Sequence, residues 1–140
     1  MNIYQILIEY EGTNFVGWQI QKNGLSIQEV VQKSLKKLIK KNITIFGSGR
    51  TDAGVHAIEQ SAHFKTDYQI KNKINFIKSL NFFLSKYDVS ILDIKKKPEQ
   101  FHARHSAKTR AYKYLILNRQ SDSVLERNRV WHVRKKLNLK

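Results

Sequence analysis

The sequence predicts an α+β fold in which a mostly antiparallel sheet carries two helices packed on one face. Short β-rich stretches alternate along the chain with two stretches of helical periodicity, and no internal repeat or low-complexity linker interrupts them. The chain has 140 residues, of which 41% are hydrophobic, so it can bury a core of its own. These observations predict a single domain over residues 1–140.

The first half of the chain is expected to form a strand, a helix and a second strand. Residues 2–10 are rich in β-formers and predict the first strand. Ser26 and Glu29 have the S-x-x-E spacing of a capping box, which predicts that a helix begins at Ser26. Residues 43–46 predict a short strand that leads into a glycine-rich loop. The helix has apolar residues at the i, i+3, i+4 spacing of one buried stripe: Ile27, Val30, Val31, Leu35, Leu38 and Ile39.

The opposite face of this helix is basic. Its lysines are Lys33, Lys36, Lys37 and Lys40. A solvated helix face accounts for these lysines, and so does direct contact with RNA. The sequence leaves both interpretations open.

The second half is expected to repeat the pattern. Residues 60–65 predict a strand and residues 72–86 a second helix. Residues 89–94 predict a further strand, which ends at a lysine run. Residues 107–118 carry tyrosines on one alternating face, which is typical of a strand, and residues 130–133 favour a short one.

The chain is strongly basic, with 26 Lys plus Arg against 11 Asp plus Glu and a formal net charge of +15. This charge favours a polyphosphate partner, although a lysine-rich composition alone can produce the same balance. The lysines do not form one basic amphipathic helix, and no run of about 18 apolar residues exists, so no membrane role is expected. Because the chain has no cysteine and no signal-peptide pattern, the expected location is the cytoplasm.

The most informative stretch is GSGRTDAGVHA, from Gly47 to Ala57. From Gly49 to Gly54 it has the glycine spacing of a nucleotide-binding P-loop, but Val and His stand where Lys and Ser or Thr are required. Compared with the dinucleotide pattern G-x-G-x-x-G, it has Asp52 in place of the third glycine, and a carboxylate there would repel a pyrophosphate. Neither kind of nucleotide site is therefore expected.

The loop is better suited to presenting Asp52. Its three glycines are expected to let the backbone adopt positive φ and to leave room for a base to approach. Arg50 can keep Asp52 ionised, and nucleophilic attack requires an ionised carboxylate. The alternative is a tight turn in which Asp52 caps a helix and Arg50 forms a surface ion pair.

Four segments, in the same order, resemble the tRNA pseudouridine synthase A family and together cover nearly all of the chain. The loop of residues 47–57 is similar to the family's catalytic loop. The segment YEGTNFVGWQ resembles its N-terminal signature, with Glu11 where Asp is expected. The segment FHARHSA resembles F-x-A-R-F-S-A, with His105 in place of Phe, and residues 109–118 resemble an R-x-Y-x-Y…N strand.

This resemblance implies a fold and a reaction. The fold would be a ferredoxin/RRM-like half of a pseudouridine synthase. The reaction would be the isomerisation of uridine to pseudouridine at positions 38–40 of the tRNA anticodon stem-loop, without a cofactor or metal. Asp52 would be the nucleophile, attacking either the sugar C1′ or the base C6. Arg50 would hold the space of the flipped base, and Tyr112 would stack on the uracil.

The resemblance also implies RNA contacts and partners. Arg104, His56 and Arg110 are candidate RNA contacts. The histidines are not expected to bind metal, because no cysteine is available and the predicted elements do not bring the five histidines together. Family members are longer, contain a second similar half and are homodimers. The chain is therefore expected to be an N-terminal half and a partial enzyme that is inactive alone. The alternative is a non-catalytic basic RNA-binding module of the same fold, which would not need Asp52.

Overall fold

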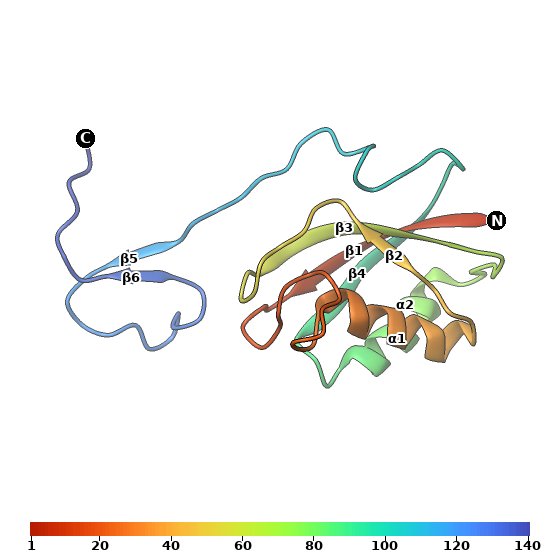
Figure 1. The fold of residues 1–140 in the computed structure, drawn as a ribbon, viewed down its shortest axis with the longest axis horizontal. Coiled ribbons are helices and arrows are strands. Elements are labelled where there is room, and N and C mark those ends of the chain that lie inside the picture. Colours follow the sequence, from red (N-terminus) through yellow and green to blue (C-terminus); the bar gives the residue numbers. More distant parts are fainter. The chain divides into compact units, whose positions relative to one another are not determined.

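The computed structural model describes all 140 residues of the chain. The chain divides into two compact units, residues 1–108 and residues 109–140, and each is described by itself (Figure 1). The single domain expected over residues 1–140 stays a prediction.

The first unit is a four-stranded antiparallel sheet with two helices on one face (Figure 1). The strand order is β2-β3-β1-β4, so β1 lies between β3 and β4. This is the split β-α-β arrangement of ferredoxin-like folds. The predicted α+β class, with both helices on one face, is confirmed. The elements are β1 (Asn2–Tyr10), α1 (Ile27–Ile39), β2 (Ile45–Gly47), β3 (Ala57–Thr66), α2 (Lys73–Leu84) and β4 (Val89–Lys97).

Both helices begin at a polar cap. The Ser26 hydroxyl accepts a hydrogen bond from the Glu29 N–H at 3.1 Å, as the capping-box spacing predicts, and the Asn72 side chain accepts one from the Asn75 N–H at 2.9 Å. The helix α1 ends at Ile39 and is followed by the cap residue Lys40, whose φ of 63° is left-handed. Neither α1 nor α2 is long and apolar enough to cross a membrane.

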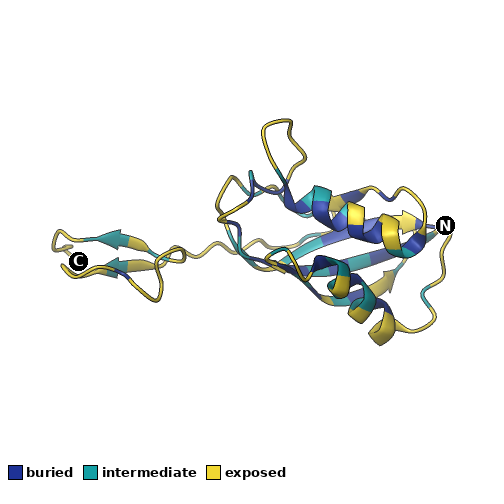
Figure 2. Ribbon diagram, turned by 90° about the horizontal axis from the view of Figure 1, so that it is seen from below, coloured by how far each residue is buried: buried dark blue, intermediate teal, exposed yellow.

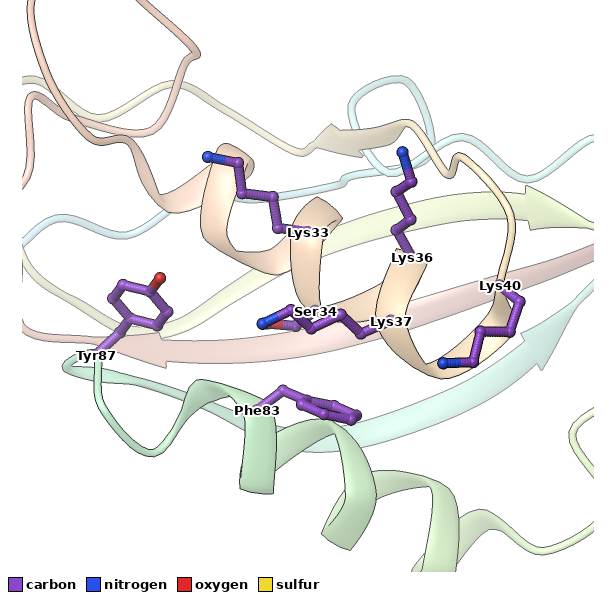
Figure 3. A pocket seen from close by; sticks show the side chains of 7 residues that line it. All are labelled: Lys33, Ser34, Lys36, Lys37, Lys40, Phe83 and Tyr87. Carbon is purple, nitrogen blue, oxygen red and sulfur yellow. The ribbon is translucent and has the colours of Figure 1, made fainter.

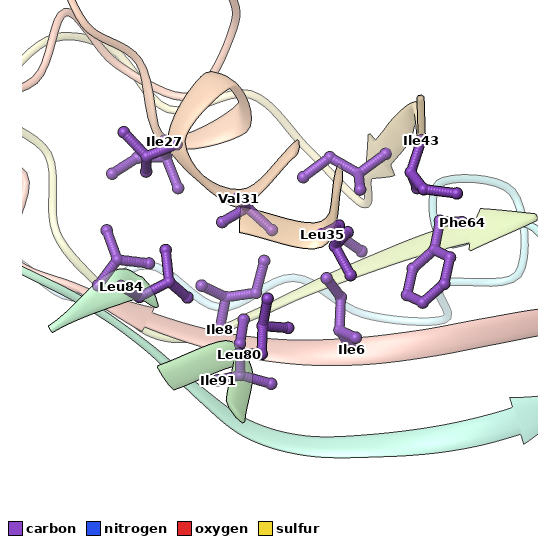
Figure 4. Packing of buried hydrophobic residues seen from close by; sticks show 14 of the residues in the cluster. Ile6, Ile8, Ile27, Val31, Leu35, Ile43, Phe64, Leu80, Leu84 and Ile91 are labelled. Atoms are coloured by element: carbon purple, nitrogen blue, oxygen red, sulfur yellow. The ribbon is translucent and has the colours of Figure 1, made fainter. Parts of the chain in front are cut away.

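The core lies between the sheet and the two helices (Figures 2 and 4). Alternate residues of β1 point toward the helices, and the stripe predicted on α1 meets them. Leu80 and Leu84 of α2 pack on the same face of the sheet, beside α1. Each buried aliphatic side chain stabilises the fold by about 1.5–3 kcal/mol. Fully or almost fully buried members include Ile6, Ile8, Ile27, Val31, Leu35, Phe64, Leu80, Leu84 and Ile91.

The second unit contains two short parallel strands, β5 (Ile116–Asn118) and β6 (Trp131–Val133). The short strand expected at 130–133 is therefore confirmed. The strand expected over 107–118 is wrong except for its last three residues. The Leu115 carbonyl accepts a hydrogen bond from the Trp131 N–H at 2.7 Å, but residues 109–115 pair with no strand and therefore form none. An alternating pattern alone does not supply a partner.

Candidate active site

Asp52 lies in the loop that joins β2 to β3. These strands pair as an antiparallel hairpin that brings Gly47 opposite Ala62. The strand β3 begins at Ala57, which pairs with Tyr10 at the end of β1. The loop of residues 48–56 is therefore fixed at the end of the sheet, beside the end of its central strand β1.

The segment between β1 and α1, residues 11–26, together with the end of β1, holds the loop at Thr51. We call residues 11–26 the N-terminal segment. The Trp18 N–H donates to the Thr51 carbonyl at 3.0 Å, and the Thr51 and Tyr10 hydroxyls are 2.8 Å apart. Trp18 and Tyr10 are themselves buried, with ring centroids 6.4 Å apart. On the other flank, the Gln60 Nε2 donates to the Gly49 carbonyl at 2.7 Å. The residue directly before Asp52 is thus fixed by its backbone and by its side chain. The sequence did not single out Thr51.

Two glycines of the N-terminal segment allow the backbone of the Asp52 loop to pack directly against the backbone of that segment. A Cβ on Gly12 would lie 2.0 Å from the Val55 carbonyl oxygen. A Cβ on Gly17, where φ is +109°, would lie 2.5 Å from the Thr51 carbonyl oxygen. A side chain at either position would push the loop away from β1. The resemblance placed both glycines in a signature segment, but only the backbone contacts explain them.

The glycines within the loop do not all have the expected role. Gly54 has a φ of +78°, but it is the only loop glycine with a positive φ. Gly47 instead supplies space, because a Cβ there would lie 2.8–2.9 Å from ring atoms of Trp18. The expectation of positive φ at all three loop glycines is therefore wrong.

Asp52 and Arg50 are both exposed. The Asp52 carbonyl accepts a hydrogen bond from the Val55 N–H at 3.1 Å, whereas its carboxylate makes no hydrogen bond or ion pair. No helix begins in this loop, and Arg50 is not paired with a carboxylate. The alternative of a helix-capping Asp52 and an ion-paired Arg50 is thus wrong. Both charged groups are available to a ligand.

His56 connects the loop to the N-terminal segment. Its Nδ1 accepts a hydrogen bond from the Gly12 N–H at 2.8 Å, so that nitrogen carries no proton in this arrangement. The Glu11 Oε1 lies 3.2 Å from the same nitrogen and also accepts from the Thr13 N–H at 3.2 Å. The predicted contact of His56 with RNA stays a prediction.

Arg104 belongs to a segment that crosses the sheet face opposite the helices. The Ala103 N–H donates to Nδ1 of His63 at 3.1 Å, and His63 is only 1% exposed. The His63 ring stacks on Phe46 and lies 4.5 Å from the His102 ring. Burial, assisted by the charge of His102, lowers the pKa of His63 to about 4, so its ring is neutral at pH 7.

The anchoring of Ala103 on His63 places Arg104 in the same unit as Asp52, with Arg104 exposed. Its contact with RNA remains a prediction. The neighbouring histidines do not form a metal centre, because no three His, Asp or Glu side chains lie close enough to hold an ion.

Arg110 and Tyr112 lie in the second unit. Both are exposed, and the Tyr112 side chain is 70% exposed. No helix or strand holds either residue. Their predicted roles, RNA contact for Arg110 and uracil stacking for Tyr112, therefore stay predictions.

Known proteins resemble nearly the whole chain. The model of the family described as tRNA pseudouridine synthase matches residues 6–106. Curated relatives named tRNA pseudouridine synthase A include those of Pelagibacter ubique, 57% identical over 136 residues, and Ruminiclostridium cellulolyticum, 47% identical over 139 residues. These alignments cover 97% and 99% of the chain but only 55% and 56% of the relatives, so the chain spans about half their length. The chain belongs to the tRNA pseudouridine synthase family.

Proposed function

We propose that the chain carries the catalytic loop of a tRNA pseudouridine synthase and that Asp52 is its nucleophile. The substrate would be uridine at positions 38–40 of the tRNA anticodon stem-loop. One observation carries the proposal: Asp52 has an exposed, unpaired carboxylate in a loop fixed by Thr51 on one side and by Gln60 on the other. A nucleophile needs both an available oxygen and a fixed position.

The reaction is an isomerisation in which no atoms are lost. If the Asp52 carboxylate attacks C1′, a C1′–O bond forms and the bond from C1′ to N1 of the uracil breaks. The uracil rotates, C5 bonds to C1′, and the carboxylate leaves. The C5 proton is removed and N1 gains one. If Asp52 instead attacks C6, it forms a bond to the base before the glycosidic bond breaks. Both routes fit an unpaired carboxylate.

Arg50 and Tyr112 would assist this reaction. Flipping a uridine out of its stack costs a few kcal/mol, and the Arg50 side chain can occupy the vacated space or bind a phosphate. The Tyr112 ring can stack on the flipped uracil. We propose Arg104, His56 and Arg110 as further RNA contacts. No cofactor is required, because the carboxylate provides the nucleophile and the base itself provides the leaving group.

A tRNA substrate also implies the cytoplasm as the place of action. We propose in addition that the full-length form is a homodimer. For the test, the chain is joined to the part of the Pelagibacter relative that its alignment leaves uncovered, which gives an extended protein. Light scattering of this extended protein measures its oligomeric state.

The nucleophile is tested with Asp52→Asn in that extended protein. Tritium release from C5-labelled tRNA measures the reaction, and filter binding measures affinity for the same tRNA. We expect Asp52→Asn to lower the rate at least about 10³-fold, because the amide cannot form the covalent intermediate, while affinity stays within about threefold. Asp88→Asn is the matched control, since it removes one exposed carboxylate from the same unit.

Activity of Asp52→Asn within tenfold of the parent would contradict the nucleophile assignment. If the extended parent protein binds tRNA but never releases tritium, the chain is instead a non-catalytic RNA-binding module. We expect the 140-residue chain alone to bind tRNA weakly and to release none.

A further inference from the structure

A basic groove runs between the two helices. It has a volume of about 460 Å³ and is lined from α1 and from the end of α2 and the turn that follows it (Figure 3). We call it the lysine groove. Its lining residues are Lys33, Ser34, Lys36, Lys37, Lys40, Phe83 and Tyr87.

The helical repeat of α1 gathers these lysines on one side. Their positions follow the spacing i, i+3, i+4 and i+7, which places residues on one helix face. Figure 3 shows Lys37 and Lys40 beside Phe83, with Lys33 and Lys36 extending outward from α1. The Lys37 ammonium lies 5.8 Å from the centre of the Phe83 ring, within range of a cation–π contact.

The charge of the lysine groove is largely uncompensated. No Asp or Glu lines it. Lys33 forms an ion pair with Glu29 at 2.5 Å, and the hydrogen bond to Glu29 raises the pKa of Lys33. Lys36, Lys37 and Lys40 have no carboxylate partner within 4.0 Å. Three positive charges on one helix face are therefore open to an anionic ligand.

A purely local explanation accounts for part of this pattern. Lys36 and Lys37 lie in the last turn of α1, where positive charge is favoured by the helix dipole. One or two lysines suffice for that effect. It does not require Lys40 beyond the helix end, nor a surface shared with aromatic rings of the next helix.

We propose that the lysine groove binds backbone phosphates of the tRNA at nucleotides away from the uridine at Asp52. This inference rests on the proposed function, because it takes tRNA as the ligand. The helix α1 connects the two places: the Ile27 N–H at its start donates to the Gly17 carbonyl beside the Asp52 loop. Lys36 and Lys40 lie nine and 13 residues further along, about 14–20 Å at 1.5 Å per residue.

An extended polyanion suits the lysine groove better than a membrane does. The apolar stripe of α1 is buried in the core, so the helix has no apolar face to insert among lipids. Lysine is a compact charge on a flexible stem that tolerates variable geometry, as binding to a nucleic-acid backbone requires. Phosphate contacts of this kind position an RNA without reading its sequence.

The test measures affinity of the 140-residue chain for an unmodified tRNA transcript by fluorescence anisotropy across a salt series. The variant is Lys36→Ala/Lys37→Ala/Lys40→Ala. The matched control is Lys71→Ala/Lys108→Ala/Lys136→Ala, which also removes three exposed positive charges. We expect the groove variant to bind at least about tenfold more weakly near 0.1 M salt. Its slope of log affinity against log salt should fall by about 2, since each lost phosphate contact removes 0.7–0.9. The control should change affinity less than threefold.

A third variant, Lys36→Arg/Lys37→Arg/Lys40→Arg, keeps the charge and should retain the parent's affinity. A urea melt of each variant separates loss of binding from loss of folding. Equal effects of the groove and control triples would overturn the proposal, as would absence of tRNA binding by the parent. So would binding of the parent, but not the groove variant, to phosphatidylserine vesicles with tRNA affinity unchanged. Failure of Asp52→Asn to lower activity would overturn the proposed nucleophile and leave these binding results standing.

Discussion

The two units of the chain differ in what holds them together. In residues 1–108 a continuous apolar cluster joins the sheet to both helices. In residues 109–140 every residue except Ser123 is at least partly exposed, and the short strands β5 and β6 are joined mainly by backbone and side-chain hydrogen bonds. Solvent-exposed hydrogen bonds contribute little net stability, so the second unit is expected to open at much lower free energy.

The candidate site is divided in the same way. Asp52, Arg50, His56 and Arg104 lie in the first unit, whereas Arg110 and Tyr112 lie in the second. The loop of Asp52 is fixed by buried aromatic residues, while no helix or strand holds Tyr112. The residues proposed to react are therefore held more firmly than the residue proposed to stack on the base.

The largest expected difference between the units is the effect of removing a leucine side chain. Leu80 is fully buried and Leu125 is 94% exposed. Leu80→Ala should lower the free energy of unfolding by about 2–5 kcal/mol, because it removes apolar contacts and leaves a cavity. Leu125→Ala should change it by less than about 0.5 kcal/mol.

Urea unfolding measures both variants, and the two tryptophans permit a separate reading of each unit. Trp18 lies in the first unit and Trp131 in the second, so Trp131→Phe leaves a fluorophore that reports only on the first. If Leu125→Ala lowered the free energy of unfolding as much as Leu80→Ala does, the second unit would have an apolar core of its own. The difference between the two units would then be wrong.

A smaller effect is expected from lowering the pH, which should reduce the free energy of unfolding of the first unit. Because the pKa of His63 is lowered from 6.5 to about 4, the folded protein binds a proton there less readily than the unfolded chain does. The stability that neutral His63 contributes to the folded state is fully present above pH 6.5 and is lost as the pH falls toward 4. Between pH 7.5 and 5.0 the free energy of unfolding should fall by about 2 kcal/mol from this residue alone.

The test of this acid effect is a substitution of His63, which is almost fully buried. His63→Phe should remove most of the loss of stability on acidification. Urea unfolding at both pH values measures the difference. Equal pH dependence in the parent and in His63→Phe would show that His63 does not titrate on unfolding.

Much of the first unit could be predicted because its patterns are local. The cap at Ser26 and the apolar stripe of α1 are read from residues three or four apart, and the strands from alternation. The strand expected over 107–118 failed because a strand needs a partner that its own residues do not specify. The burial of His63 was also beyond prediction, since it depends on a segment 40 residues further along the chain.

The sequence predicted that Asp52 is exposed in its loop, but it did not predict which residues hold the loop in place. The string around Asp52 indicated a presented carboxylate, and the structure bears out that it is exposed and unpaired. The support comes from the approach of two backbone segments, seen in the space that Gly12 and Gly17 leave for Val55 and Thr51. Such contacts join residues more than 30 positions apart and have no local pattern.

The smallest expected effects compare polar side chains that bind the backbone in each unit. The Ser26 hydroxyl, which is fully buried, caps α1, so Ser26→Ala should lower the free energy of unfolding by about 1 kcal/mol. Asn118 donates to the Val133 and Lys135 carbonyls at 2.7 and 2.8 Å, but it is exposed. Water can replace those bonds, so Asn118→Ala should change global stability by less than about 0.5 kcal/mol.

In the Trp18→Phe variant, Trp131 is the remaining tryptophan, and its fluorescence reports on the second unit alone. If Asn118→Ala leaves global unfolding unchanged but shifts the Trp131 emission toward that of the unfolded chain, the second unit depends on a few exposed side-chain bonds. If Asn118→Ala instead lowers global stability as much as Ser26→Ala does, the two units unfold together. In that case Tyr112 would belong to the same cooperative structure as Asp52, and the difference between the two halves of the candidate site would disappear.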